Sequence, residues 1–231
     1  MPRDVGVVVV AAGKGERAGG GVPKQYRPIA GVPMLLRSVR PFAAHPDVLH
    51  IVVALPAADA AEPPAWLAGL GAHLSIVAGG ATRTASVAAA LDAMPAGCRV
   101  VLVHDAARPF VARETIDAVL TEARLGHGAV AAVPLGDTLK EAAPGGDGRT
   151  VARTVPREHL WRAQTPQGFP RDVLVAAHAR ARQDGHVATD DAGLVERIGQ
   201  PVRLVPDSPA NVKVTTPDDF ALAERRAEGG G

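Results

Sequence analysis

The chain has 231 residues, a formal net charge of +1 and 47% apolar residues, of which few are aromatic. This length fits one or two domains of about 150 residues each, and the apolar content is enough for a core of Val, Leu, Ile and Ala. No basic run or aromatic-interleaved patch occurs, which argues against a nucleic-acid partner. The single cysteine, Cys98, excludes a disulfide within the chain and a cysteine-based metal cage.

The apolar runs are far shorter than the ~20 residues of a membrane-spanning helix. The amino-terminal residues lead into a strand-like run without the pattern of a signal peptide. We therefore expect no membrane association and a cytoplasmic location.

Strand and helix patterns alternate along the first 134 residues. Strands are expected at 5–10, 50–55, 74–77, 100–103 and 129–134, and helices at 33–42, 84–94 and 114–124. Segment 57–71 is rich in Ala and Pro and is predicted to be a loop with one helical turn. Such alternation predicts an α/β fold: a Rossmann-like three-layer sandwich with a mostly parallel, twisted sheet.

The pattern changes after Gly136. Segments 137–141 and 149–155 are both strand-prone, and together they predict a protruding β-arm at 137–155 within a single domain of residues 1–231. Such an arm is too poor in large apolar residues to fold alone. We therefore expect a homodimer in which the arms exchange contacts. Helices are predicted again at 172–183, at 189–198 and from Thr216 onward, and strands at 202–205 and 212–215.

A glycine-rich loop follows the first predicted strand and is the strongest functional signal. Gly13, Gly15 and Ala18 satisfy the dinucleotide fingerprint G-x-G-x-x-G/A. That fingerprint requires a helix to run on from the loop, and Pro23 and Pro28 fall where this helix would continue. The P-loop pattern needs Gly-Lys followed by Ser or Thr, and this loop has no such triplet.

The loop also carries two cations, Arg17 and Lys24. The interpretation that needs no helix is an irregular loop that wraps a nucleoside triphosphate, with these cations as charge clamps. Glycines let backbone N–H groups approach an anion closely. The alternative is an ordinary solvated turn.

Asp105 and Arg108 follow a strand that is apolar throughout, at 100–103. Ligands of open parallel sheets bind beyond the carboxyl ends of the strands. We therefore expect Asp105 to hold Mg²⁺ or hydroxyl groups and Arg108 to face a phosphate. The alternative is a surface ion pair between the two residues, worth little energetically.

Further polar residues appear later in the chain. Arg157 follows the arm, and Lys213 is placed within the predicted strand at 212–215. Thr138, Thr165 and Thr189 stand in loop-like settings, where each suits a phosphate or polyol hydroxyl and equally suits a turn or helix cap. Loop, cations and acids together fit phosphoryl or nucleotidyl transfer.

The chain resembles the 2-C-methyl-D-erythritol 4-phosphate cytidylyltransferase family of the non-mevalonate isoprenoid pathway. Nine motifs stand in the family's order: Ala-Ala-Gly-x-Gly-x-Arg at 11–17, Pro-Lys-Gln-Tyr at 23–26, Gly-Gly-x-x-Arg-x-x-Ser-Val at 79–87, Val-His-Asp-Ala-Ala-Arg-Pro at 103–109, Asp-Thr-Leu-Lys at 137–140, Thr-Val-Pro-Arg at 154–157, Leu-Trp-x-x-x-Thr-Pro-Gln at 160–167, Thr-Asp at 189–190 and Asn-Val-Lys-Val-Thr at 211–215. One departure is Ala210, which stands where the family often has an acid.

The resemblance implies transfer of CMP from CTP to 2-C-methyl-D-erythritol 4-phosphate, with release of pyrophosphate and with Mg²⁺ as cofactor. It implies four catalytic cations: Arg17, Lys24, Arg157 and Lys213. It implies substrate contacts through Ala11, Ala12, Gly13, Gly80, Ala81, Ser86, Asp105, Arg108, Thr138, Thr165 and Thr189, with Asp105 also a metal ligand.

Three other functions stay open on the residues alone. A related cytidylyltransferase could act on another polyol phosphate, such as ribitol 5-phosphate. The chain could also be a dinucleotide-dependent oxidoreductase or a nucleotide-binding module without catalysis.

Overall fold

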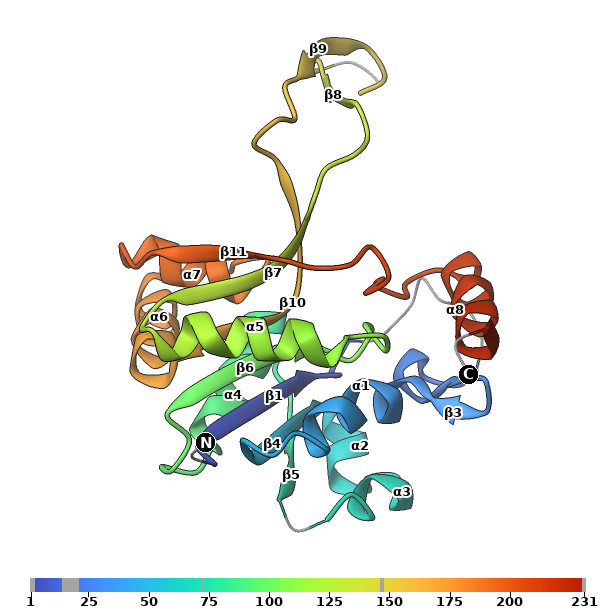
Figure 1. Ribbon diagram of the computed structural model, residues 1–231, viewed down its shortest axis with the longest axis vertical. Helices are drawn as coiled ribbons and strands as arrows, with labels where there is room; N and C mark the ends of the chain where they lie inside the picture. The colour runs from blue at the N-terminus through green and yellow to red at the C-terminus, as the bar shows by residue number, and fades with distance from the viewer. Residues whose placement is uncertain (1–2, 14–20, 72, 146–147, 230–231) are drawn as a thin grey trace.

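A seven-stranded sheet forms the centre of the computed structural model, which describes residues 3–13, 21–71, 73–145 and 148–229 (Figure 1). Its strands lie in the order β11-β7-β10-β6-β1-β4-β5. Their bounds are β1 Val5–Val10, β4 Val48–Leu55, β5 Leu74–Ala78, β6 Val100–Asp105, β7 Gly128–Pro134, β10 Trp161–Pro170 and β11 Val202–Pro206.

All neighbouring strands of this sheet are parallel except β10, which runs antiparallel to both β6 and β7. β1 is central, and its Val8 lies opposite Val52 of β4 and Val103 of β6. The burial of both faces of β1 explains why its sequence is apolar throughout rather than alternating. The carboxyl ends of β1, β4, β5 and β6 therefore meet at one edge of the sheet.

Helices cover both faces of the sheet, which confirms the predicted three-layer α/β sandwich. The apolar stripes of α1 (Met34–Ala43) and α5 (Arg113–Arg124) join Val7 and Val9 in one buried cluster. Helices α4 (Arg83–Asp92), α6 (Arg171–Asp184) and α7 (Asp191–Arg197) pack with Val8 on the other face. Alternate residues of β1 thus pack into two separate cores, because successive side chains of a strand point to opposite faces of the sheet. Cys98 is fully buried in the second core.

A third, smaller cluster lies at the carboxyl edge of the sheet. It joins helix α8 (Pro217–Gly229) to a short hairpin of β2 (Pro28–Ile29) and β3 (Val32–Pro33). Val214 is completely buried in this cluster, beside Phe220. The burial of Val214 anchors the segment that carries the neighbouring Lys213.

Strands β8 (Leu139–Ala142) and β9 (Val151–Val155) pair antiparallel and form the predicted arm. Figure 1 shows the arm projecting from the sheet, well away from the helices. Its residues are mostly exposed. The arm is thus present in this chain, and its exchange with a second copy stays a prediction.

The secondary structure differs from the prediction in three places: segment 212–215, strand β10 and segment 57–71. The segment at 212–215 is not a strand: the Val214 N–H donates to the Ala107 carbonyl at 2.8 Å, outside any ladder. Strand β10 was not predicted at all, because its polar centre and Pro166 hide the strand pattern. The ladder between β10 and β7 has a register shift between Ala163 and Gln167.

Segment 57–71 contains two short helices, α2 (Ala57–Ala61) and α3 (Ala65–Ala68), rather than a single helical turn. Just before the β2–β3 hairpin, residues Lys24–Tyr26 form a short 3-10 helix, η2. In the part of the chain that the structure describes, no helix combines the length and apolarity needed to cross a membrane.

Candidate active site

Two loops approach each other closely where β1 and β5 end. The Ala11 N–H donates to the Ala54 carbonyl at 2.9 Å, and the Gly79 N–H donates to the Leu55 carbonyl at 2.7 Å. Both loops are therefore tied to the carboxyl end of β4. A Cβ atom on Gly79 would lie only 2.3 Å from the Cβ of Ala12, so this position requires glycine. Gly13 is the last described residue of the first loop, and Arg17 lies outside the described residues.

The second loop runs into the amino terminus of α4. Ser86 is buried, and its Oγ accepts from the Gly80 N–H at 3.1 Å and donates to the Thr82 carbonyl at 2.9 Å. Thr82 caps the helix by accepting from the Ala85 N–H. These bonds fix the backbone at Gly80 and Ala81, which is itself exposed. Such a rigid, exposed backbone next to a glycine loop can hydrogen-bond to the edge of a flat base.

Lys24 lies at the start of η2, and its Nζ donates to the Val214 carbonyl at 2.8 Å. Tyr26 holds this short helix in place by donating its hydroxyl to Asp59 Oδ2 at 2.7 Å and by an edge contact with Trp66. Burial, followed by the hydrogen bond to Asp59, raises the pKa of Tyr26 well above its usual value. The tyrosine therefore stays a protonated donor. Lys24 thus contacts the segment that carries Lys213.

Asp105, the last residue of β6, is held between two cations. Its Oδ2 accepts from Lys213 Nζ at 2.7 Å, and its Oδ1 accepts from Arg83 Nε at 3.2 Å. Burial raises the pKa of this carboxyl, but Arg83 and Lys213 outweigh burial and hold the pKa well below its usual range. Asp105 is therefore ionised at neutral pH.

A series of buried hydrogen bonds holds the backbone of Asp105 in place. The Asp105 N–H donates to Thr165 Oγ1 at 3.1 Å, and Thr165 Oγ1 lies 3.0 Å from His104 Nδ1. His104 Nε2 lies 2.9 Å from the carbonyl oxygen of Arg108, which can only accept. The proton is therefore on Nε2, and Thr165 donates to Nδ1. Burial lowers the pKa of His104 to about 4, so the ring is neutral.

Arg108 is buried, and it does not form the ion pair with Asp105 that was the alternative interpretation. Its Nη1 donates to the Asn211 carbonyl at 2.7 Å and its Nη2 to the Ala163 carbonyl at 3.4 Å. Among the described residues, Arg108 Nε, Asn211 Oδ1 and Gln164 Oε1 are buried without a hydrogen-bond partner. The interpretation of a surface ion pair between Asp105 and Arg108 is therefore wrong. Burial lowers the pKa of Arg108, but arginine remains charged in proteins.

Thr165 and Thr189 differ in burial and in the contacts of their hydroxyl groups. Thr165 is buried within β10, so its predicted loop setting was wrong, and its hydroxyl is already used by His104 and Asp105. Thr189 is exposed and directly precedes Asp190, the cap of α7. Gln167 of β10 donates to Asp190 Oδ2 at 2.8 Å, which ties the start of α7 to the sheet.

Thr138 and Arg157 lie apart from these residues. Both are exposed at the base of the arm, where Arg157 donates to the Gly136 carbonyl. Figure 1 shows the arm leading away from the ends of β1 and β6. The single chain therefore does not bring Thr138 and Arg157 to Asp105.

The donor set for a metal ion at this site is limited. Both oxygens of Asp105 are engaged by cations, and the described residues contain no cluster of three or more His, Cys, Asp or Glu that could hold a metal. A dedicated Mg²⁺ cage of protein ligands does not fit here. Mg²⁺ commonly binds through one or two carboxylates together with substrate phosphates, so the phosphates would have to supply most of its ligands.

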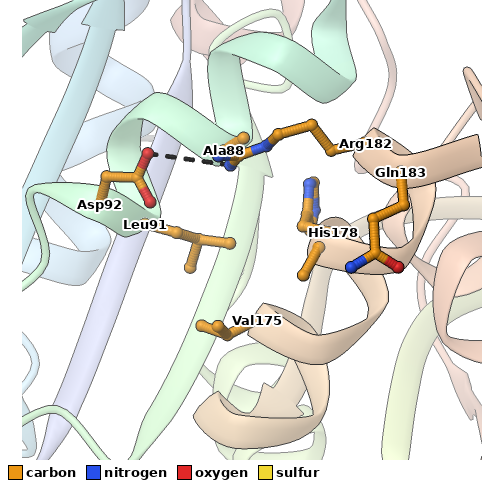
Figure 2. A pocket seen from close by; sticks show the side chains of 8 residues that line it. Ala88, Leu91, Asp92, Val175, His178, Arg182 and Gln183 are labelled. Atoms are coloured by element: carbon orange, nitrogen blue, oxygen red, sulfur yellow. Dashed lines mark ion pairs between the residues drawn. The ribbon is translucent and has the colours of Figure 1, made fainter. Parts of the chain in front are cut away.

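A separate cavity of about 500 Å³ lies between α4 and α6. Figure 2 shows its lining, with Asp92 of α4 facing Arg182 of α6 and His178 below them. Among the described residues, its lining comes from α4 and α6 and includes no residue of the glycine-rich loops. We therefore place the active site at the strand ends and not in this cavity.

The sequence interpretation missed three residues that organise the site: Arg83, His104 and Asp191. Arg83 and His104 stand inside the quoted motifs, so their position in register was an available signal. Asp191 follows Thr189-Asp190 directly, and its side chain is completely buried. No periodicity marks this buried charge, because its partner Arg83 lies 108 residues away along the chain.

A parallel sheet whose glycine loops and cations meet at the carboxyl ends of its strands is the arrangement of α/β proteins that bind phosphorylated ligands. The comparisons with known proteins agree. A family model described as 2-C-methyl-D-erythritol 4-phosphate cytidylyltransferase (IspD) matches residues 5–227. The chain therefore belongs to the 2-C-methyl-D-erythritol 4-phosphate cytidylyltransferase family.

Individual relatives carry the same description. A protein from Symbiobacterium thermophilum is 47% identical over 220 residues, which are 95% of this chain and 91% of the relative. One from Frankia casuarinae is 48% identical over 221 residues, covering 95% and 80%. The crystal structure of the Thermus thermophilus protein is similar with a TM-score of 0.79 and 40% identity, covering 96% of this chain and 98% of that one.

Proposed function

We propose that this chain transfers CMP from CTP to 2-C-methyl-D-erythritol 4-phosphate, giving 4-diphosphocytidyl-2-C-methyl-D-erythritol and pyrophosphate. The phosphate of the acceptor attacks the α-phosphorus of CTP in line, and the bond to the pyrophosphate oxygen breaks. The single observation that carries this proposal is the cluster of Lys24, Lys213, Arg83 and Asp105 at the strand ends, in a chain that matches the family model over residues 5–227.

Electrostatic repulsion is the main obstacle to this reaction, because two highly anionic molecules must come within bonding distance. Further negative charge develops as the fifth oxygen reaches the α-phosphorus. Cations that are already held in place lower this barrier without reorganising during the reaction. Lys24 and Lys213 are suited to this role because both are anchored to the 213–214 segment or its partner Asp105.

The cytidine of CTP fits the two loops at the ends of β1 and β5. At the proposed base site, the backbone of Gly79 lies against the methyl group of Ala12. We assign Ala11, Ala12, Gly13, Gly80, Ala81 and Ser86 to the nucleoside. Lys24 and Arg17 are assigned to its phosphates.

The acceptor fits beside β6. We assign Lys213 to its phosphate, and Asp105, Arg108, Thr165 and Thr189 to the surroundings of its polyol. The unpartnered Nε of Arg108 is consistent with such a polar ligand. The hydroxyl of Thr165 is better placed to support Asp105 through the backbone than to bind substrate directly.

Thr138 and Arg157 reach an active site only if a second copy of the chain supplies them. We propose a homodimer in which each arm completes the site of the other subunit, with Arg157 as a cation for the attacking phosphate. The exposure of both residues on an arm that projects from the sheet supports this proposal.

Mixing two inactive variants tests the shared site. Lys24→Ala and Arg157→Ala homodimers should each be inactive, while a mixture that is allowed to exchange subunits should recover about a quarter of the wild-type activity, since half of its dimers have one intact site. A mixture that stays inactive, with heterodimers demonstrated by mass spectrometry, would contradict the shared site.

We propose Mg²⁺ as the cofactor, bound chiefly by the phosphates of CTP. A direct contact with Asp105 would require this carboxylate to release Arg83 or Lys213. When bound, the ion would neutralise phosphate charge. A cytoplasmic location stays a prediction.

The direct test is a mass-detected assay with CTP and 2-C-methyl-D-erythritol 4-phosphate. We expect formation of the CDP-linked product together with pyrophosphate. Ribitol 5-phosphate serves as the competing acceptor, and a higher kcat/KM with it would replace the proposed substrate. CTP binding without turnover on either acceptor would overturn the enzymatic proposal.

A further inference from the structure

We propose that Arg83 is a positioning residue, which fixes the Asp105 carboxylate, and through it the Lys213 ammonium, by clamping Asp105 to the buried Asp191 of α7. This inference rests on the proposed function, because it assigns Asp105 and Lys213 to the reaction. No substrate or metal contact assigned above includes Arg83 or Asp191.

The clamp is a continuous series of ion pairs and one hydrogen bond that joins the segment at Lys213 to β6, α4, α7 and α6. Arg83, the first residue of α4, donates from Nε to Asp105 Oδ1 at 3.2 Å and from Nη1 to Asp191 Oδ2 at 2.6 Å. The remaining oxygen of Asp105 accepts from Lys213 at 2.7 Å. The remaining oxygen of Asp191 accepts from His178 Nε2 at 2.9 Å. Each carboxylate oxygen therefore has its own donor, and neither carboxylate can rotate without losing one.

The series is most deeply buried at Asp191 and most exposed at Lys213. Asp191 is 0% exposed and Asp105 is 8% exposed, whereas the side chain of Lys213 is 46% exposed. The N–H groups of Asp191 and Ala192 also donate to Gln167 of β10, both at 3.0 Å. The ion pairs of the clamp therefore hold the solvent-exposed ammonium group of Lys213 in a defined position relative to α7 and β10. A side chain locked in this way is preorganised for its ligand.

The series also explains how Asp105 can share Lys213 with a phosphate. Arg83 stays beside Asp105 when the Lys213 ammonium, still in contact with Asp105, also binds an anion, so Asp105 does not become an unpaired buried charge. Such a charge would cost far more than the pair contributes.

A purely structural role would make Arg83 only a link between α4 and α7. The chain offers a matched control for this alternative in Arg124, at the amino end of the sheet. Arg124 also bridges two aspartates, Asp4 at 2.9 Å and Asp47 at 2.8 Å. Its side chain is 24% exposed, against 22% for Arg83.

The test is a double-mutant cycle on kcat/KM. Arg83→Met should lower kcat/KM by about tenfold to a hundredfold, since small misplacements of catalytic groups have effects of this size. In a Lys213→Ala background the same change should cost less than about threefold, because the group that Arg83 positions is gone. Arg124→Met should change kcat/KM by less than about twofold in both backgrounds, when activities are normalised to folded protein.

Full additivity of Arg83→Met and Lys213→Ala would overturn the proposal, as would an equal loss in Arg124→Met. If Arg83→Met does not fold, Arg83→Lys replaces it. A lysine can reach only one of the two aspartates, so we expect an intermediate loss that is again absent in the Lys213→Ala background.

A crystal structure of Arg83→Met provides a readout without activity. We expect the Asp105 carboxylate to rotate and its contact with Lys213 to change, and an unchanged Asp105–Lys213 pair would overturn the proposal. A wild-type protein that does not turn over CTP would refute the proposed function, and this crystal structure would then decide the positioning role alone.

Discussion

At each end of the central sheet one arginine forms ion pairs with two aspartates, but the two ends differ in function. At the amino end, Arg124 bridges Asp4 and Asp47 before β1 and β4. At the carboxyl end, Arg83 bridges Asp105 and Asp191. Each bridge joins one arginine to two acids, but the carboxyl end adds Lys24 and Lys213. The comparison shows that an arginine between two carboxylates joins neighbouring elements but has its charge neutralised. Binding of anions requires further cations, which the carboxyl end has in Lys24 and Lys213.

The glycines differ in the same way. Gly6 lies in β1 toward the amino end, where an added Cβ would meet the Met94 sulfur at 2.5 Å in the core. Gly79 lies in the carboxyl-end loop, where an added Cβ would meet Ala12. One glycine makes room for core packing, and the other brings two ligand-binding loops together. Four predictions test this contrast between the two ends.

Lys24→Ala should have the largest effect. Removing one cation that stabilises the transition state typically costs ~3 kcal/mol, so kcat should fall by about a hundredfold or more. The fold should survive, because the Nζ of Lys24 donates to an otherwise ordinary backbone carbonyl. Steady-state kinetics and circular dichroism measure the two quantities. Turnover near the wild-type value would remove Lys24 from the site.

Acidification should destabilise the carboxyl end through His104. Its pKa is 6.5 in the unfolded chain and about 4 when buried, so the unfolded chain binds more protons between these values. The free energy of unfolding should therefore fall as the pH falls from 6.5 to 4, by ~3 kcal/mol in total. Denaturant titrations at several pH values measure this slope.

His104→Gln is the control for this slope. The pKa of His50 is also lowered, by burial and by His73, so part of the pH dependence should remain in the variant. Only the difference between wild type and His104→Gln reports on the carboxyl end. Identical slopes would mean that His104 is not held neutral.

Gly79→Ala should weaken the nucleotide site. The new methyl group must push the Ala12 loop away, since the Cβ–Cβ distance of 2.3 Å cannot be tolerated. We expect KM for CTP to rise by about tenfold, or ~1.4 kcal/mol, with a smaller change in KM for the acceptor. An unchanged KM for CTP would show that the contact between Gly79 and Ala12 plays no part in nucleotide binding.

Gly6→Ala should have the smallest effect and should change only stability. The flexible Met94 side chain can move, so overpacking should cost ~1 kcal/mol, at the low end of its usual range. Thermal unfolding should detect the loss, and kcat/KM of the folded protein should match wild type. An effect on CTP binding would show that the two ends are coupled.

Much of the fold was predictable because parallel strands that are buried on both faces leave an unmistakable apolar run, as in β1 and β6. The helices predicted at 33–42 and 114–124 were also found, and their residues Leu35 and Val119 are buried in the core that covers one face of the sheet. Strand β10 was not predictable in this way, because polar residues and Pro166 interrupt it. Its place in the centre of the sheet is decided by its neighbours β6 and β7.

The site was predicted unevenly. The strand patterns correctly placed the first glycine loop and Asp105 at the carboxyl ends of two neighbouring strands, but the only ion pair that spacing offered for Asp105 was the alternative one with nearby Arg108. The actual partners, Arg83 and Lys213, come from α4 and from the segment after β11. Local spacing favours nearby partners, whereas a buried carboxylate takes whichever cations the packed elements bring to it.

By itself, the sequence determined the alternation of strands and helices, the glycine loops and the arm, because each depends on residues that are near one another in the chain. Only the tertiary structure decided which charges meet, the neutral state of His104, and the distance of Thr138 and Arg157 from Asp105. These properties depend on burial and on contacts between distant segments, and both exist only once the layers have packed.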